Sequence, residues 1–395
     1  MRNLLVILET SLGVIVVIGA GLLLRSFRRI EQVPLGFQPQ GVLTFRVIPR
    51  GARYAEVSQR AAFYQQALLQ LKGLPEVKSA GAVRFLPLTL IRASKGFTIE
   101  GRAQNAPGQI PMTGYSVVTP GYFSTMQIPL LEGRDFSWTD TVNGQPVTII
   151  NSAMAKLYWP GDDPLGKRIR QSGPDDHELS WLTIAGVVGD VREFDPVNQP
   201  RPTMYFPLTQ FADADGILRD WVIRTAGDPI RVASGIRGAI WSVDKDLPIT
   251  RVRTMEEVRS MSVGSRRLSL ILFSLFAAIA MILATVGIYG VMTYRVTQRT
   301  REIGIRVALG APSNQVMRLV VGQAARLATV GVFLGVIGAL ALTRLMAGMV
   351  YSVSSTDPAT FVTVALLLTL MALAACYLPA RRAMKVDPLV ALRYE

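Results

Sequence analysis

Long apolar runs lie near both ends of the chain and enclose a long segment of mixed polarity. Leu4–Leu24 is apolar except for Glu9, Thr10, Ser11 and small glycines. At about 1.5 Å of rise per residue, a helix over this run reaches roughly 31 Å, the thickness of the hydrocarbon core of a bilayer. The same test selects three further runs, Leu268–Thr293, Leu327–Met346 and Phe361–Leu378. The pattern therefore predicts four transmembrane helices.

The first apolar run allows two interpretations. Arg2 precedes it, as a positive charge precedes the apolar core of a cleaved signal peptide. The run is longer than a typical signal, however, and Glu9 interrupts it early. Three arginines then follow without a small-residue cleavage site (Arg25, Arg28, Arg29). We therefore expect an uncleaved membrane-spanning helix.

Short β-like runs alternate with amphipathic helical stretches between the first and second apolar runs. Val42–Ile48, Ala55–Lys72 and Val77–Val83 predict a β-α-β unit. We expect further strands at Tyr115–Val118, Val147–Ile150, Leu182–Val188, Thr203–Phe206, Trp221–Arg224 and Ile249–Val252, and helices at Asn151–Tyr158 and Arg231–Val243. The class predicted for this part of the chain is α+β.

The limits of this α+β domain depend on its turns and on its last helix. Turn signals are dense around residues 100–112 and 171–180, which indicates surface loops or a subdomain break. Met255–Arg267 either continues as one helix into the second span or forms a short helix joined to it by a turn at Gly264. The predicted organisation is a first transmembrane helix (1–25), an extracytoplasmic α+β domain (26–267) and a three-helix membrane domain (268–395).

Composition and charge change this picture little. The chain is 50% hydrophobic and 18% charged, with a mean hydropathy of +0.32, which fits a mixture of membrane and soluble parts. The net charge of +14 raises nucleic acid as a partner, but the basic residues are scattered and many lie beside apolar runs. We expect no nucleic-acid binding. A single cysteine, Cys376, excludes a disulfide framework, so an outer domain of about 240 residues depends on its apolar core.

The short loops determine orientation, because long domains cross a membrane regardless of charge. The loop after the second span is rich in arginine (Arg295, Arg299, Arg301, Arg306, Arg318, Arg326), and so is the C-terminal tail (Arg381, Arg382, Lys385, Arg393). Ala347–Ala359 carries no Lys or Arg and one acid, Asp357. We expect both termini on the cytoplasmic side of the cell (inner) membrane and Ser26–Arg267 outside. Five arginines then flank the outer domain against the rule (Arg25, Arg28, Arg29, Arg266, Arg267).

Three candidate sites for chemistry are weak. Gly161–Lys167 has the spacing of a phosphate-binding loop, but Arg168 replaces the Ser or Thr that holds magnesium, so we expect a turn. The only histidine, His177, lies in an acidic loop and lacks the further His or Cys residues of a metal cage. Glu9, within the first span, either marks an ion path or extends to the interface, and the second is favoured. We expect no metal site, no cofactor and no enzyme activity.

The loop after the second span carries the most informative pattern. Within Arg295–Pro312, Ile303, Val307 and Gly310 fall near one helical face, and Gly310 provides a helix stop. A second helix begins at Pro312-Ser313 and runs into the third span. The arginines alone would set topology, but an apolar face followed by a Gly-Ala-Pro corner also suits a protein partner.

The sequence from Arg299 to Ala311 reads RTREIGIRVALGA and resembles the loop between the second and third spans of MacB/FtsX-type ABC transporter permeases. The resemblance extends to further segments along nearly the whole chain (Gly21–Phe27, Gly36-Phe37, Val117–Phe123, Gly186–Val191, Pro379–Ala383, Asp387–Arg393). These last motifs look most like the second half of the duplicated orphan permeases, which usually have eight spans. The chain therefore resembles either a half-length member of that group or a part of a longer protein.

The resemblance implies a MacB-like periplasmic core between helices 1 and 2, and an FtsX-like domain whose cytoplasmic loop, 295–326, docks a separate ABC ATPase. The residues that it marks for this coupling are Arg299, Glu302, Ile303, Gly304, Arg306, Ala308 and Gly310. No Walker motif is present, so ATP hydrolysis is expected in another chain. The resemblance also implies pairing with a second copy or another half-permease, an exterior adaptor, and export or mechanotransmission. The alternative is an FtsX-like signalling or scaffold protein that controls an exterior partner without transport.

Overall fold

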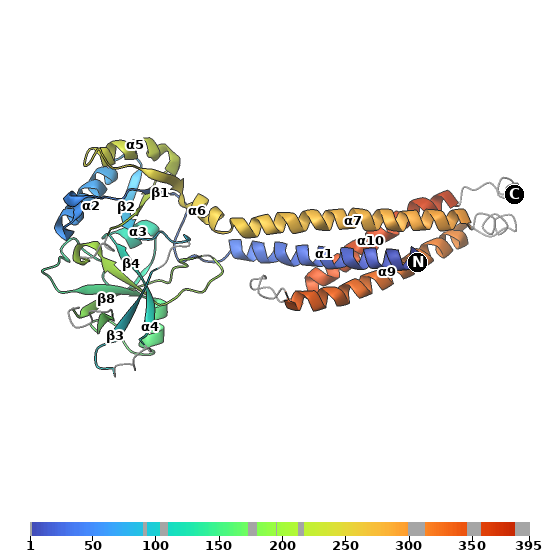
Figure 1. The fold of residues 1–395 in the computed structure, drawn as a ribbon, viewed down its shortest axis with the longest axis horizontal. Coiled ribbons are helices and arrows are strands. Elements are labelled where there is room, and N and C mark those ends of the chain that lie inside the picture. The colour runs from blue at the N-terminus through green and yellow to red at the C-terminus, as the bar shows by residue number, and fades with distance from the viewer. Residues whose placement is uncertain are drawn as a thin grey trace. The chain divides into compact units, whose positions relative to one another are not determined.

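The computed structural model describes residues 2–89, 93–102, 110–172, 180–194, 196–211, 217–298, 313–345 and 357–383 (Figure 1). The chain separates into two compact units. The bundle unit contains the N-terminal helix and the residues after 264, and the sheet unit is Val33–Gly264. Among the predicted features, the segment Arg299–Ala311, His177 and the motif Asp387–Arg393 lie outside the described residues.

Four long helices form the described part of the bundle unit: α1 (Arg2–Glu31), α7 (Gly264–Gln298), α9 (Ser313–Leu345) and α10 (Pro358–Ala383). Three of the predicted apolar runs fall wholly within them, the third run lies in α9 as far as Leu345, where the described part ends, and α9 begins at Ser313 as predicted. Three helices contain windows long and apolar enough to cross a membrane, at Val6–Glu31, Arg266–Tyr294 and Pro358–Ala375. Helix α9 contributes a shorter apolar stretch, Thr329–Thr343, so its crossing of the membrane stays a prediction.

One part of the sheet unit, which we name the open half, has a split β-α-β architecture. Strands β1 (Val42–Arg46), β2 (Val77–Val83), β10 (Asp220–Thr225) and β11 (Thr250–Thr254) lie in the order β11-β1-β10-β2, each antiparallel to its neighbours. Helices α2 (Val57–Lys72) and α5 (Pro229–Trp241) connect β1 to β2 and β10 to β11. This is the order of the ferredoxin-like motif. The predicted β-α-β unit is confirmed, but β10 lies between its two strands.

The residues between β2 and β10 form the second part of the sheet unit, the closed half. Its strands are β3 (Ser94–Ile99), β4 (Met112–Val118), β5 (Leu130–Gly133), β6 (Val147–Asn151), β7 (Arg168–Ser172), β8 (Leu182–Val188) and β9 (Thr203–Pro207). The pairing runs β4-β3-β7-β8-β6-β9, and β9 pairs with β4 in parallel, so that six strands form a closed ring. Strand β5 pairs with β8 beside the ring. Helices α3 (Tyr122–Met126) and α4 (Ser152–Tyr158) complete this half.

Alternation along the strands of the open half divides its apolar residues between two faces. Phe45 of β1 and Trp221 of β10 belong to a core shared with α2 and α5, whereas Val42 and Val222 belong to a second core with α3. Because successive residues of a strand point to opposite faces, one short strand contributes to both cores. Figure 1 shows α2 and α5 over the strands β1 and β2.

The predicted strands and helices of the sheet unit are confirmed to within a few residues. The short strands β3, β5 and β7 and the five-residue helix α3 were not predicted. Helix α6 (Met255–Ser262) ends before Val263, and α7 begins at Gly264. The structure thus supports the short helix joined by a turn and not one continuous helix from Met255.

Candidate functional site

The candidate coupling segment connects the ends of two helices of the bundle unit. Helix α7 remains regular to its last residue, since Thr297 Oγ1 donates to the carbonyl of Thr293 and Gln298 Nε2 donates to Tyr294 Oη at 2.9 Å. Helix α9 begins at Ser313. The motif residues between them, Arg299, Glu302, Ile303, Gly304, Arg306, Ala308 and Gly310, lie outside the described chain. Any movement of this segment therefore acts on the ends of α7 and α9.

Helix α1 contacts each of the other three described helices of the bundle. Glu9 lies over Gly287 of α7, Thr10 and Val14 lie against α9, and Gly21 lies against Thr360 of α10. In the most apolar 18-residue stretch of each helix, 50% of α1 is buried, whereas only 17% of α7 and 24% of α10 are buried. Helix α1 is thus the shared packing partner, while much of the apolar surface of α7 and α10 faces outward.

The carboxylate of Glu9 occupies space that Gly287 leaves free. A Cβ at Gly287 would lie 2.2 Å from Glu9 Oε2, a distance that real Cβ atoms do not show. The Glu9 side chain is partly exposed and belongs to the α1–α7 contact. Neither an ion path nor an interfacial role follows from this contact alone, so the preference for the interface stays a prediction.

Small residues on α9 allow α1 to approach closely. A Cβ at Gly335 would lie 2.5 Å from Val14 Cβ and 2.8 Å from the carbonyl oxygen of Ser11. One turn earlier, a Cβ at Gly331 would lie 2.8 Å from Thr10 Cβ. Glycines four residues apart form the small-xxx-small pattern that lets two membrane helices pack at backbone distance. The α1–α9 contact therefore depends on Gly331 and Gly335.

An ion pair joins α1 to the start of α10. Arg25 Nη1 donates to Asp357 Oδ2, and the same oxygen accepts from the backbone N–H of Thr360 at 3.0 Å and from its hydroxyl at 2.6 Å. Asp357 therefore caps α10 and binds the charge of Arg25. The pair gives a structural role to one of the five arginines that are expected to flank the outer domain against the charge rule.

Reversing one charge of this pair is expected to destabilise the bundle unit. Asp357→Arg places two cations together and removes the cap of α10, so the thermal unfolding midpoint of the chain in detergent should fall. Adding Arg25→Asp restores an attractive pair and should recover part of the loss. An Arg25→Asp/Asp357→Arg variant no more stable than Asp357→Arg alone would show that the ion pair contributes nothing.

The open and closed halves of the sheet unit meet at a narrow strand junction. The only described register pair between β2 and β4 is Val83 with Val118. Two backbone hydrogen bonds flank it, from Arg84 N–H to Val117 O at 2.9 Å and from Thr119 N–H to Ala82 O at 3.0 Å. Neighbouring strands elsewhere share up to six register pairs, as β10 and β2 do. Among the adjacent strands of the described sheet, β2 and β4 therefore share the fewest register pairs.

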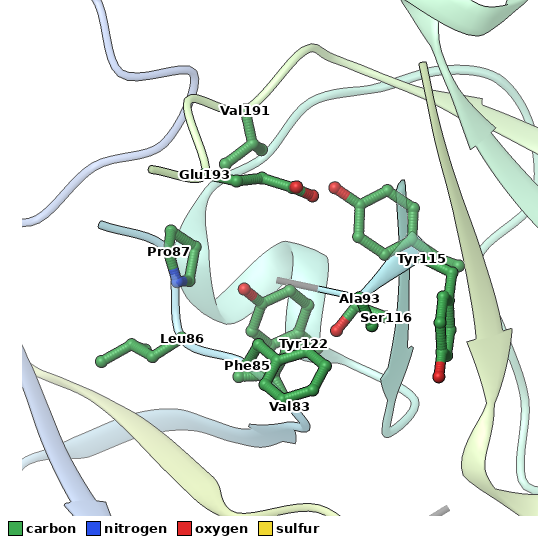
Figure 2. Close-up of a pocket in the computed structure, with 11 residues that line it drawn as sticks. Val83, Phe85, Leu86, Pro87, Ala93, Tyr115, Ser116, Tyr122, Val191 and Glu193 are labelled. Atoms are coloured by element: carbon green, nitrogen blue, oxygen red, sulfur yellow. The ribbon is translucent and has the colours of Figure 1, made fainter. Parts of the chain in front are cut away.

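A small cavity of about 20 Å³ lies beside this junction. Its lining comes from both halves and includes Val83, Phe85 and Leu86 at the end of β2, Tyr115 and Ser116 of β4, Tyr122 of α3, Tyr205 of β9 and Glu193 (Figure 2). Burial raises the pKa of Glu193 from its ordinary 4.5 to about 7, although a hydrogen bond from Thr203 and the charge of Arg201 oppose the rise. A carboxyl group with this pKa changes its charge near neutral pH.

The segment with phosphate-loop spacing is a turn, as predicted. Asp163 Oδ1 accepts from the backbone N–H of Leu165 at 2.8 Å, and Lys167 Nζ lies 3.1 Å from Asp162 Oδ2. The groups that would face a phosphate are thus bound to aspartates of the same segment. Within the described ranges, no group of three or more His, Cys, Asp or Glu residues has the geometry to hold a metal ion.

Two family profiles match the chain, one over its N-terminal part and the other over its C-terminal part. The profile of the MacB-like periplasmic core domain matches residues 4–234, more than half of the chain, and the FtsX-like permease C-terminal profile matches residues 274–388. The chain belongs to the MacB/FtsX-type ABC transporter permeases. The recognition made from Arg299–Ala311 is thereby confirmed, and this permease is a membrane protein with a MacB-like periplasmic domain.

Curated relatives agree with this family. The ABC transporter permease YknZ of Bacillus subtilis, itself uncharacterized, is 25% identical over 416 aligned residues, which cover 100% of this chain and 96% of that protein. The macrolide export ATP-binding/permease protein MacB of Mannheimia succiniciproducens is 25% identical over 287 residues, 69% of this chain. The pyoverdine export ATP-binding/permease protein PvdT of Pseudomonas syringae is 28% identical over 272 residues, 68% of this chain. The matches span only 42% and 40% of those two relatives.

The comparison with solved structures gives partial matches at low identity. The periplasmic region of MacB from Actinobacillus actinomycetemcomitans has a TM-score of 0.37 at 13% identity and covers 57% of this chain and 94% of that structure. The extracellular domain of YknZ has a TM-score of 0.33 at 17% identity and covers 53% of this chain and all of that domain.

Proposed function

We propose that this permease couples a separate cytoplasmic ABC ATPase to movements of its periplasmic domain, with Arg299–Ala311 as the docking segment. The main support is that the FtsX-like profile covers this segment and that it joins the ends of α7 and α9. The ATPase that binds there would pull on two helices of the bundle at once. Since MacB and PvdT are named as combined ATP-binding/permease proteins, a separate ATPase would supply here what those chains carry themselves.

The membrane arrangement proposed with this role has four spans, α9 included, and both termini in the cytoplasm. The arginine-rich loop after α7 and the neutral segment before α10 support that orientation. The Arg25–Asp357 pair also supports it, because it joins the end of α1 to the start of α10, and the proposal puts both on the outer side. We propose domain limits at 1–25, 26–267 and 268–395.

Each motif residue has a proposed part in docking. Arg299, Glu302 and Arg306 offer charges for ion pairs with the ATPase, whereas Ile303 and Ala308 supply the apolar surface that a stable contact requires. Gly304 and Gly310 would let the backbone of the partner approach. A buried charge pair loses several kcal/mol when one member is reversed, roughly 2 to 5 kcal/mol, so Glu302 and Arg306 are the informative positions.

The output of the coupling has two candidate forms. In the first, two permease copies, or this chain and another half-permease, move their periplasmic domains to expel a substrate through an exterior adaptor. In the second, the same movement controls an exterior enzyme, and nothing is transported. The MacB-like periplasmic domain favours the first. Deletion of the protein separates them, since only the first predicts altered cellular retention of a compound.

The coupling is tested by co-purification. The full chain with an affinity tag is expressed together with candidate ABC ATPases, and the captured ATPase is quantified for wild type, Glu302→Arg and Arg306→Glu. We expect wild type to retain an ATPase and each reversal to reduce capture at least about tenfold, as a loss of roughly 2 kcal/mol or more implies. Arg381→Glu, at an exposed arginine of α10 outside the 295–326 loop, is the matched control and should bind like wild type.

Two results would contradict the proposal. One is a wild-type chain that captures none of the ATPases, and the other is equal capture by wild type and both reversed variants. Equal loss in Arg381→Glu and Arg306→Glu would assign binding to general positive charge and not to the motif.

A further inference from the structure

The segment that carries Glu193 connects the two halves of the sheet unit beside their narrow junction. Its backbone is bound to the chain that leaves the open half after β2 and to the chain that enters β1: Leu88 N–H donates to Glu193 O at 2.7 Å, and Arg192 N–H donates to Leu35 O at 3.0 Å. The Glu193 side chain reaches the closed half, where Thr203 Oγ1 donates to its carboxylate at 3.4 Å. One short segment therefore binds the chain on either side of the open half through its backbone and binds β9 through its side chain.

The carboxyl group of Glu193 faces a cavity with few hydrogen-bond partners. Figure 2 shows it directed into the space between the surrounding side chains. Among the described residues, the side chain of Glu193 has one hydrogen bond, the long one from Thr203, and takes part in no ion pair. Ser116 Oγ, which lines the same cavity, is buried without a hydrogen-bond partner. The cavity of about 20 Å³ has room for about one water molecule, which these two groups could bind.

The charged and titratable groups around Glu193 do not supply a counter-ion at ion-pair distance. Arg201 is the cation whose field reaches it, and its guanidinium lies over the ring of Phe194 at 5.4 Å. Arg84 donates to Tyr115 Oη at 2.7 Å, and Asp220 is held by Arg46. In the part of the chain that the structure describes, the neighbouring charged and titratable residues include Asp190, Arg192, Arg201, Tyr205, Tyr115, Tyr122, Arg84 and Asp220. An ionised Glu193 would therefore depend on water for its solvation.

We propose that Glu193 is a proton-controlled latch between the two halves of the periplasmic domain. With its proton, the carboxyl group fits the small cavity, and the segment holds the halves together across the β2–β4 junction. Without the proton, the carboxylate draws further water into the cavity and loosens that junction. A domain that transmits movement would then be stiffer in an acidic exterior than in an alkaline one.

The sign of the effect follows from burial. Because burial raises the pKa of Glu193 from 4.5 to about 7, the folded domain keeps this proton at pH values where the unfolded chain has lost it. The stabilisation is complete below pH 4.5 and is lost as the pH rises through about 7. The latch is therefore closed at low pH and weakened above neutrality.

Hydrogen exchange at the junction measures the latch directly. The full chain in nanodiscs is compared at pH 5.5 and 8.5, with rates corrected for intrinsic exchange, at the amides of Arg84 and Thr119. We expect protection of both amides to fall at least about tenfold at the higher pH in wild type. Glu193→Gln, which is neutral throughout, should keep the high protection at both pH values. Glu132→Gln, at an exposed acid of β5, is the matched control and should behave as wild type.

A distance measurement keeps the proposal testable if Glu193→Gln folds poorly. Cys376 is the only cysteine, so Cys376→Ala provides a background for spin labels at Leu69→Cys of α2 and Leu157→Cys of α4, which are both exposed and lie in different halves. The inter-label distance distribution of the otherwise wild-type chain should broaden as the pH rises through about 7. A distribution that does not change with pH, or junction amides whose pH dependence is the same in wild type and Glu193→Gln, would overturn the latch. Binding of the ATPase is not an element of either test, so the latch and the coupling proposal can fail separately.

Discussion

Trp221→Ala is expected to lower the free energy of unfolding of the periplasmic domain by about 4 kcal/mol. Trp221, the second residue of β10, is fully buried. Its ring stacks on Tyr64 of α2 at 5.1 Å and on Phe45 of β1 at 5.8 Å, and its Nε1 donates to Val47 O at 3.3 Å. Truncation would leave a cavity between the sheet and α2 and an unpaired carbonyl group.

Tryptophan fluorescence reports on this domain alone within the full chain. All five tryptophans lie between residues 138 and 241, inside the sheet unit. Urea unfolding in detergent, followed by this fluorescence, should show a lower midpoint for Trp221→Ala. Trp241→Ala is the matched control, because Trp241 on α5 is 44% exposed and its loss should cost about 1 kcal/mol or less. Equal midpoints for the two variants would mean that the aromatic cluster around Trp221 is not the main stabilising core.

Apolar patterning predicted the elements that are buried on a regular period. Strand β8 reads as an apolar run with Thr183 as its one polar residue, and its observed bounds, Leu182–Val188, are those predicted. Strand β7 was not predicted because arginines occupy two of its five positions and only Ile169 is fully buried. Strand β5 is exposed along its whole length, so neither alternation nor an apolar run marks it. Burial decides which strands the sequence reveals.

The two candidate sites, Arg299–Ala311 and Glu193, also differ in whether the sequence could reveal them. Arg299–Ala311 was found by its resemblance to a family, and burial had no part in the prediction. Glu193 was missed, since one glutamate in a short polar segment is typical of a solvated loop. Its burial comes from Tyr115, Tyr122 and Tyr205, which the fold brings from β4, α3 and β9. A sequence signal for such a site would require knowing that these strands meet, and a single sequence does not contain that information.

Gly335→Val is expected to destabilise the helix bundle by about 3 kcal/mol, because overpacking of a close contact costs roughly 1 to 3 kcal/mol and here the obstacle includes backbone. The first added carbon would lie 2.5 Å from Val14 Cβ and 2.8 Å from the carbonyl oxygen of Ser11. A side chain can change rotamer, but the backbone of α1 can only move away. Because Gly331 contacts α1 one turn earlier, separation at Gly335 would also weaken that contact.

The matched control for this change is Gly322→Val on the same helix. A Cβ at Gly322 has no neighbouring atom within 4 Å, and both variants gain the same side chain with the same helix propensity. Unfolding in a titration of sodium dodecyl sulfate against mild detergent, followed by helical circular dichroism, should shift for Gly335→Val and not for Gly322→Val. Because α9 carries the C-terminal anchor of the docking segment and α1 contacts α7 as well, loosening of the α1–α9 contact should also reduce ATPase capture. If Gly335→Val unfolds like Gly322→Val, then α1 and α9 are not packed at backbone distance, and coupling must pass through α7 alone.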